Sequence, residues 1–187
     1  MAIATDAPSP AAEIANSYIN SGKTESNNRV VLTMKKVLVV FDSSYGNTEK
    51  LAREIAAGIT DTGKADCTVI GVSEVSSHDF TAFDGVLLGG PIHMFRAARG
   101  LRGAVTNAIN AGLAGKLVGA FETYQSPGHA GRAVKHVEEE IAEKVPNARL
   151  FTPGLASLVD GRKGPLNAAE PAKAREFGQR FAAELGD

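Results

Sequence analysis

The sequence predicts an α/β fold in which helices cover both faces of a five-stranded parallel sheet, giving three layers. From Lys35 onward, apolar segments alternate with amphipathic helical patterns, and the alternation repeats five times. The first apolar segment, at residues 36–41, is nearly continuous, as expected for a strand buried on both faces of a parallel sheet. Because strand–helix–strand connections are right-handed, this pattern predicts a doubly wound sheet.

The individual elements are predicted from periodicity and from breaking residues. Leu51, Ile55 and Ile59 share one face of the first helix, and Pro146 ends the fourth because proline cannot continue a helix. Strands are expected at residues 36–41, 67–72, 86–88, 117–121 and 148–155. Helices are expected at 48–59, around 101–109, at 132–144 and at 167–185, with at most a short helix within 73–83.

The first 33 residues differ from the rest of the chain. They are rich in Ala, Ser, Asn and Pro and show no sustained helical or strand period. We therefore expect a disordered, non-functional N-terminal tail at 1–33 and one folded domain at 34–187. Met34 stands directly before the first strand, so it is also a candidate for the natural start.

Bulk composition narrows the classes of function. The formal net charge of −1 gives no overall field that would attract nucleic acid or a membrane surface. No apolar run approaches the roughly 18 residues that cross a bilayer. Cys67 is the single cysteine, which rules out an internal disulfide and fits a reducing compartment. We expect a cytoplasmic protein with neither a nucleic-acid partner nor membrane insertion.

The segment from Asp42 to Thr48 has the composition of an anion-binding loop. It carries the hydroxyls of Ser43, Ser44 and Thr48 and the amide of Asn47, around the flexible Gly46. A helix is predicted to begin here, and its free N–H groups and dipole attract an anion. An ordinary helix cap needs one such residue, whereas this loop has several. We interpret it as a phosphate-binding loop.

Other phosphate motifs do not fit this loop. The Walker pattern needs a Lys followed by Ser or Thr after its second glycine, and the dinucleotide pattern needs three spaced glycines. A phospho-accepting receiver domain needs an Asp at the end of the third strand. That strand instead ends in Gly89-Gly90-Pro91.

Three stretches together resemble the flavodoxin family, especially the flavodoxin-like domains of A-type flavoproteins and related quinone reductases. They are Phe41 to Lys50, Leu88 to Met94 and Phe121 to Gly128. The resemblance covers about residues 35–186. It implies a flavodoxin-like fold with strand order 2-1-3-4-5 and flavin mononucleotide (FMN) as the cofactor, which supplies the redox chemistry.

The resemblance also assigns residues to the cofactor. The first stretch would hold the phosphate and the second would contact the ring and ribityl chain, with Met94 or Phe95 packing on a ring face. In the third stretch, Tyr124 is the candidate to stack on the other face. The implied FMN-binding residues are Ser43, Ser44, Tyr45, Gly46, Asn47, Thr48, Pro91, Ile92, His93, Met94, Phe95, Thr123, Tyr124, Gln125 and Gly128.

Two classes of function remain open for such a protein. One is an electron carrier that docks a redox partner protein. The other is an enzyme, either an NAD(P)H:quinone-type oxidoreductase or one resembling protoporphyrinogen oxidases. Carrier flavodoxins are strongly acidic, whereas residues 35–187 hold equal numbers of basic and acidic residues. Arginines also follow the second and third stretches, at Arg96, Arg99 and Arg102 and at Arg132. The short chain without an evident substrate insertion favours electron transfer, which is the function we expect. The arginines favour an enzyme, which is the alternative.

Overall fold

The computed structural model describes residues 34–93 and 96–186. The predictions made for residues 1–33 lie outside these described residues. The strands are β1 (Lys35–Phe41), β2 (Ala65–Gly71), β3 (Gly85–His93), β4 (Arg96–Ala97), β5 (Leu117–Tyr124) and β6 (Arg149–Leu158). The helices are α2 (Asn47–Asp61), α3 (Arg99–Ala111), α4 (Arg132–Lys144) and α5 (Glu170–Glu184), with short 3₁₀ helices η1 (Val72–Ser77), η2 (Phe80–Ala82) and η3 (Pro127–His129).

The five long strands form a parallel sheet in the order β2-β1-β3-β5-β6. Counted along the chain without the two-residue β4, this order is 2-1-3-4-5, which confirms the predicted topology. The short β4 was not predicted, and it pairs antiparallel with the end of β3, Ile92 opposite Ala97. Parallel order places the carboxyl ends of all five strands along one edge, where ligands bind in such sheets.

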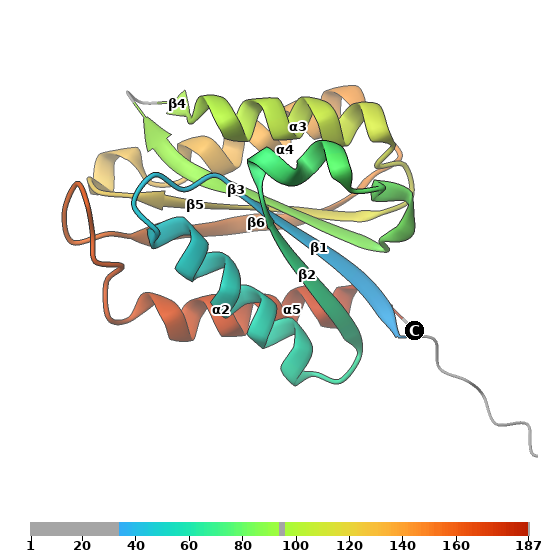
Figure 1. Cartoon of the computed structure of the whole chain (residues 1–187), viewed down its shortest axis with the longest axis horizontal. Coiled ribbons are helices and arrows are strands. Elements are labelled where there is room, and N and C mark those ends of the chain that lie inside the picture. The colour runs from blue at the N-terminus through green and yellow to red at the C-terminus, as the bar shows by residue number, and fades with distance from the viewer. Residues whose placement is uncertain (1–33, 94–95, 187) are drawn as a thin grey trace, which may run out of the picture. The chain divides into compact units, whose positions relative to one another are not determined.

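Alternating side chains of each strand feed two separate cores, so the three predicted layers are present. Leu38 and Val40 of β1 pack on the side of α3 and α4, whereas Val37 and Val39 pack on the side of α2 and α5. Figure 1 shows these two helical layers on opposite faces of the sheet. The apolar strand segments are explained by this burial on both faces.

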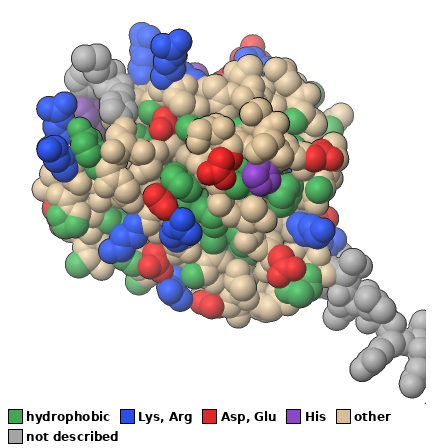
Figure 2. All heavy atoms as spheres, in the orientation of Figure 1, with side chains coloured by type: hydrophobic (Ala, Val, Ile, Leu, Met, Phe, Trp, Pro, Cys, Tyr) green, Lys and Arg blue, Asp and Glu red, His purple; other side chains and the backbone are tan. Residues whose placement is uncertain are grey.

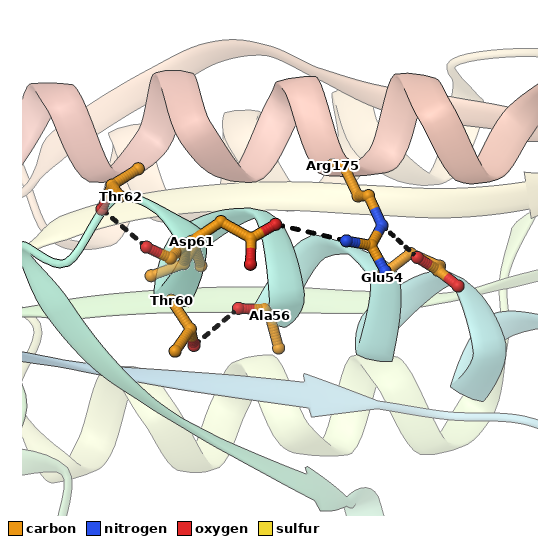
Figure 3. A network of polar contacts seen from close by, with 7 residues as sticks. Glu54, Ala56, Thr60, Asp61, Thr62 and Arg175 are labelled. Carbon is orange, nitrogen blue, oxygen red and sulfur yellow. Dashed lines mark hydrogen bonds and ion pairs between the residues drawn. The ribbon is translucent and has the colours of Figure 1, made fainter.

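Helices α2 and α5 lie against each other at two glycines. A Cβ on Gly178 would overlap the carbonyl oxygen of Ile55, and one on Gly58 would overlap the carbonyl oxygen of Arg175. Polar contacts also join the two helices: the Arg175 guanidinium of α5 donates to Glu54 Oε2 at 2.7 Å and to Asp61 Oδ2 at 3.2 Å, both on α2 (Figure 3). The close crossing fixes α2, whose first turn borders the candidate site.

Candidate functional site

A cavity of about 270 Å³ opens at the carboxyl edge of the sheet. Its walls come from the β1–α2 loop, the end of β3, the end of β5 and the loop after β6, four segments far apart in the sequence. The lining residues are Ser43, Ser44, Tyr45, Asn47, Thr48, Pro91, Ile92, Thr123, Gln125, Val159 and Arg162. Nine of these were predicted as FMN-binding residues, so the fold brings the three predicted stretches together around one cavity.

The β1–α2 loop turns tightly into the first turn of α2. Gly46 caps the helix with φ at 82°, a left-handed conformation that favours glycine. Its N–H donates to the Ser43 hydroxyl at 3.1 Å, and its carbonyl accepts the first helical bond, from Lys50, at 2.9 Å. Tyr45, at the tip of this loop, is 49% exposed. The loop therefore exposes backbone and hydroxyl groups to the cavity.

The start of α2 differs from the starts of its two neighbours. Asp42 Oδ2 accepts a bond from the N–H of Leu101, in the first turn of α3, at 3.2 Å. The Glu122 carboxylate accepts bonds from the N–H groups of Gly131, Ala133 and Val134, at the start of α4, at 2.5, 2.7 and 2.9 Å. Across residues 34–93 and 96–186, no side chain caps α2 in this way. The acidic residue in the first turn of α2 is Glu49, and its carboxylate pairs with Arg53 at 2.7 Å. A helix start whose N–H groups receive no carboxylate cap retains free N–H donors and a partial positive charge, which suit an anion.

Glu122 is fully buried at the end of β5. Burial raises the pKa of its carboxyl group, although the N–H donors of Val134, Gly131 and Ala133 act in the opposite direction. Because its oxygens are occupied by α4, this side chain is a structural cap and stands outside the cavity lining.

One hydrogen bond joins the first and third predicted stretches. The hydroxyl of Thr48, in the first turn of α2, lies 2.9 Å from the hydroxyl of Thr123, near the end of β5. Both side chains are almost fully buried, at 2% and 4% exposure. The pair fixes the distance between the phosphate-binding loop and the β5 side of the cavity.

A fourth segment of the cavity was missed by the sequence analysis. Val159 and Arg162, in the loop between β6 and α5, line the cavity. The Asn47 side chain donates from Nδ2 to the carbonyl oxygen of Lys163 at 3.0 Å, which attaches this loop to the start of α2. Its place in the predicted fold could have indicated this loop, because it also follows the carboxyl end of a parallel strand.

Of the other predicted residues, the described Tyr124 and Gly128 are absent from this cavity lining. Tyr124 is the half-buried last residue of β5, and Gly128 is exposed in η3. Gly46 contributes as the helix cap just described. His93 ends β3, where its backbone pairs with Arg96, and Met94 and Phe95 lie outside the described residues. The expected roles of these residues stay predictions.

Residues 38–158 match the flavodoxin domain family. The chain belongs to this family. Its fold is the flavodoxin-like fold and its cofactor is FMN. The phosphate of FMN is an anion, which fits the N–H groups at the start of α2, left without a carboxylate cap, and the hydroxyls around them.

Relatives of this flavodoxin domain include both small flavodoxins and larger flavoproteins. It is 29% identical over 112 residues to diflavin flavoprotein A 4 of Synechocystis sp.. The aligned region covers 58% of this chain and 18% of that protein. A flavodoxin structure from the domain Archaea has a TM-score of 0.70 at 20% identity, covering 80% of this chain and 98% of that one. Oxidised Flavodoxin 1 from Bacillus cereus has a TM-score of 0.66 at 25% identity, covering 81% and 100%. The chain spans about a fifth of the length of the curated relatives it matches.

In the described part of the flavodoxin domain, no group of three or more His, Cys, Asp and Glu side chains is placed to hold a metal ion. No described helix has the length and apolar character needed to cross a membrane.

Proposed function

We propose that this flavodoxin domain is an electron carrier that holds FMN with its phosphate at the start of α2. The observation that carries the proposal is the contrast between helix starts: carboxylates occupy those of α3 and α4, whereas hydroxyls and free N–H groups surround that of α2. A phosphate there receives several donors and a favourable helix dipole, because no carboxylate occupies the N–H groups of this helix start.

Each residue of the loop has a proposed task toward the phosphate. Ser44, Thr48 and Asn47 would donate from side chains, and the backbone N–H groups of the first turn would complete the cradle. Gly46 allows the turn, and Ser43 supports it through the Gly46 N–H. Arg162 supplies a cation from the loop after β6. Tyr45 shields the outer side of the site.

The rest of the cavity would receive the ribityl chain and the ring. Pro91 and Ile92 form an apolar wall, and Thr123 and Gln125 offer polar groups from the β5 side. By their place in the matching stretches, His93, Met94 and Phe95 remain proposed contacts on one side of the ring. Tyr124 and Gly128 remain proposed contacts on the other.

When bound, FMN supplies the redox chemistry, and the chain positions it and limits its contact with water. A carrier needs no protein acid or base, which fits a cavity wall without His, Asp or Glu among its described residues. A partner protein would exchange electrons at the exposed edge of the ring. We also propose a reducing, cytoplasmic setting, because Cys67 is a free thiol.

A second candidate function is that of an NAD(P)H:quinone-type or protoporphyrinogen-oxidase-like oxidoreductase. The observation that favours it is the group of exposed arginines that starts directly after the second stretch, at Arg96, Arg99 and Arg102. Positive charge close to the flavin stabilises its reduced, anionic form and attracts anionic substrates.

Adding NADPH anaerobically to the FMN-loaded protein, with and without a soluble quinone, separates the two functions. For a carrier, NADPH alone leaves the flavin absorbance unchanged, and the photochemically reduced protein passes its electrons to cytochrome c. Rapid bleaching by NADPH followed by multiple turnovers of the quinone would overturn the carrier proposal and support the enzyme.

A further inference from the structure

A second hollow, apart from the FMN cavity, is lined mainly by cationic side chains. It has a volume of about 320 Å³ and is formed by β4, the first turn of α3 and the start of α4. Its lining residues are Arg96, Ala97, Arg102, Arg132 and His136. We call it the arginine pocket. No carboxylate lines it among the residues that the structure describes.

Two of the pocket's cations are not engaged in ion pairs. Within the described ranges, Arg96 and Arg102 form none, whereas Arg53 pairs with Glu49 and Arg175 pairs with Glu54 and Asp61. Among the acidic side chains of α4, Glu140 pairs with Lys144 at 2.7 Å and lies 3.7 Å from His136, one of the pocket's lining residues. Together with Glu139 and Glu143, Glu140 lines a neighbouring hollow. That hollow shares Arg102 and His136 with the arginine pocket, whereas Arg96 and Arg132 line the pocket but not that hollow, and no described carboxylate accompanies them in the pocket.

The positions of these arginines run against ordinary helix preferences. Acidic residues are favoured in the first turn of a helix because they offset the positive end of its dipole. Helix α3 begins at Arg99 and has Arg102 in its first turns, and α4 begins at Arg132. Neither first turn contains an acidic residue. Residues that break the local preferences of a helix are expected at functional sites, where a ligand requires them.

The arginine pocket is continuous with the edge of the FMN cavity. A shallow groove of about 750 Å³ runs from Asp42 and Ser44 across residues 96–100 to Arg102. It shares Ser44 with the FMN cavity and Arg96, Ala97 and Arg102 with the arginine pocket. Figure 2 shows Lys and Arg side chains gathered toward the end of the molecule where α3 begins.

We propose that the arginine pocket binds a small molecule that carries two or more negative charges, as phosphate groups or clustered carboxylates. The planar guanidinium groups of Arg96, Arg102 and Arg132 suit bidentate bonds to either kind of anion. The groove lets the remainder of the same molecule reach the border of the FMN cavity at Ser44. Such a ligand would be a substrate or an effector held beside the flavin.

Calorimetric titration of the FMN-loaded protein with inorganic pyrophosphate and, separately, with citrate tests this proposal. Saturating FMN keeps the phosphate site at α2 occupied, so that added anion reports on a different site. We expect saturable 1:1 binding of at least one probe, weakened about tenfold or more by Arg102→Ala and by Arg96→Ala. A preference for pyrophosphate assigns phosphate chemistry, and a preference for citrate assigns carboxylate chemistry.

The matched control is Lys64→Ala, which removes one exposed positive charge between α2 and β2, beyond the lining of the arginine pocket. It should leave probe affinity unchanged. Absence of saturable binding of both probes would overturn the proposal, as would equal weakening by Lys64→Ala or no weakening by either arginine variant. Arg102→Ala should leave FMN affinity unchanged, so the result is separate from the FMN assignment.

Discussion

The hydroxyls of Thr48 and Thr123 lie 2.9 Å apart, although the two residues are 75 positions apart in the sequence. Thr48 belongs to the first turn of α2, and Thr123 to the end of β5, two strands away from β1 in the sheet. One buried hydrogen bond thereby connects the proposed phosphate loop with the proposed ring side of the FMN cavity. Changes at either threonine should affect cofactor binding.

Replacing Thr48 by Val should weaken FMN binding by about 1–2 kcal/mol, because the isosteric side chain removes a hydroxyl and leaves Thr123 without its partner. Fluorescence titration of FMN, which is quenched on binding, measures the change. Thr60→Val is the matched control: this threonine sits on the same helix, and its hydroxyl donates to the Ala56 carbonyl at 2.9 Å (Figure 3). Equal affinity in both variants would count against the role of Thr48.

Arg162 should contribute long-range attraction to the cofactor phosphate. Arg162→Ala is expected to weaken FMN binding and to flatten its dependence on salt between 50 and 500 mM, because an exposed ion pair is screened by salt. Lys163→Ala is the matched control, since this residue offers its backbone carbonyl to Asn47 and its side chain is absent from the cavity lining. A salt dependence that survives in Arg162→Ala would remove Arg162 from the site.

The crossing of α2 and α5 should be intolerant of side chains. Gly178→Ala places a Cβ against the Ile55 carbonyl oxygen, and we expect a loss of roughly 2 kcal/mol or more in the free energy of unfolding. Gly103 is an exposed position of α3 with open space around it. Gly103→Ala should instead raise the free energy of unfolding by up to about 1 kcal/mol through helix propensity. Urea denaturation measures both, and similar effects in the two variants would contradict the close crossing.

Glu122 should make stability depend on pH. Burial raises its pKa in the folded protein, so the folded state holds this proton more tightly than the unfolded chain, whose glutamate pKa is about 4.3. The resulting stabilisation is present below that value and is lost as pH rises through the folded pKa. The stability of wild type relative to Glu122→Gln should therefore fall from pH 4 to pH 7.

Urea denaturation at several pH values measures this trend. Glu139→Gln provides the comparison, because this exposed residue lies on the same helix, α4. A rise in the relative stability of wild type with pH would show that the three N–H donors outweigh burial.

Much of the fold could be predicted because the burial pattern is written directly in the sequence. The continuous apolar segment of β1 follows from its burial on both faces of the sheet. The spacing of Leu51, Ile55 and Ile59 follows from the burial of one face of α2. The ends of the strands were harder to predict. β5 continues to Tyr124 and β3 to His93, because pairing with neighbouring strands extends the ladder through polar residues such as Glu122 and Thr123.

The candidate site was predicted where a motif is local and missed where it depends on tertiary contacts. Ser43 to Thr48 form one contiguous loop, so their grouping was visible from residue types alone. Arg162 and the Lys163 carbonyl reach α2 only because β6 ends beside β5, with about 115 residues of intervening chain. The contrast between the helix starts likewise needs coordinates. Asp42 precedes α2 but caps α3, and Glu122 caps α4 from nine or more residues before it in the sequence.

The central claim is that the start of α2, whose N–H groups no carboxylate caps, receives the phosphate of FMN. Its most direct test is to titrate the cofactor-free protein with FMN and with riboflavin, which carries the same ring and ribityl chain but no phosphate. The structure predicts that FMN binds at least about a hundredfold more tightly, in line with several charge-assisted hydrogen bonds, and that Thr48→Val narrows the difference. Equal affinity for FMN and riboflavin would contradict it.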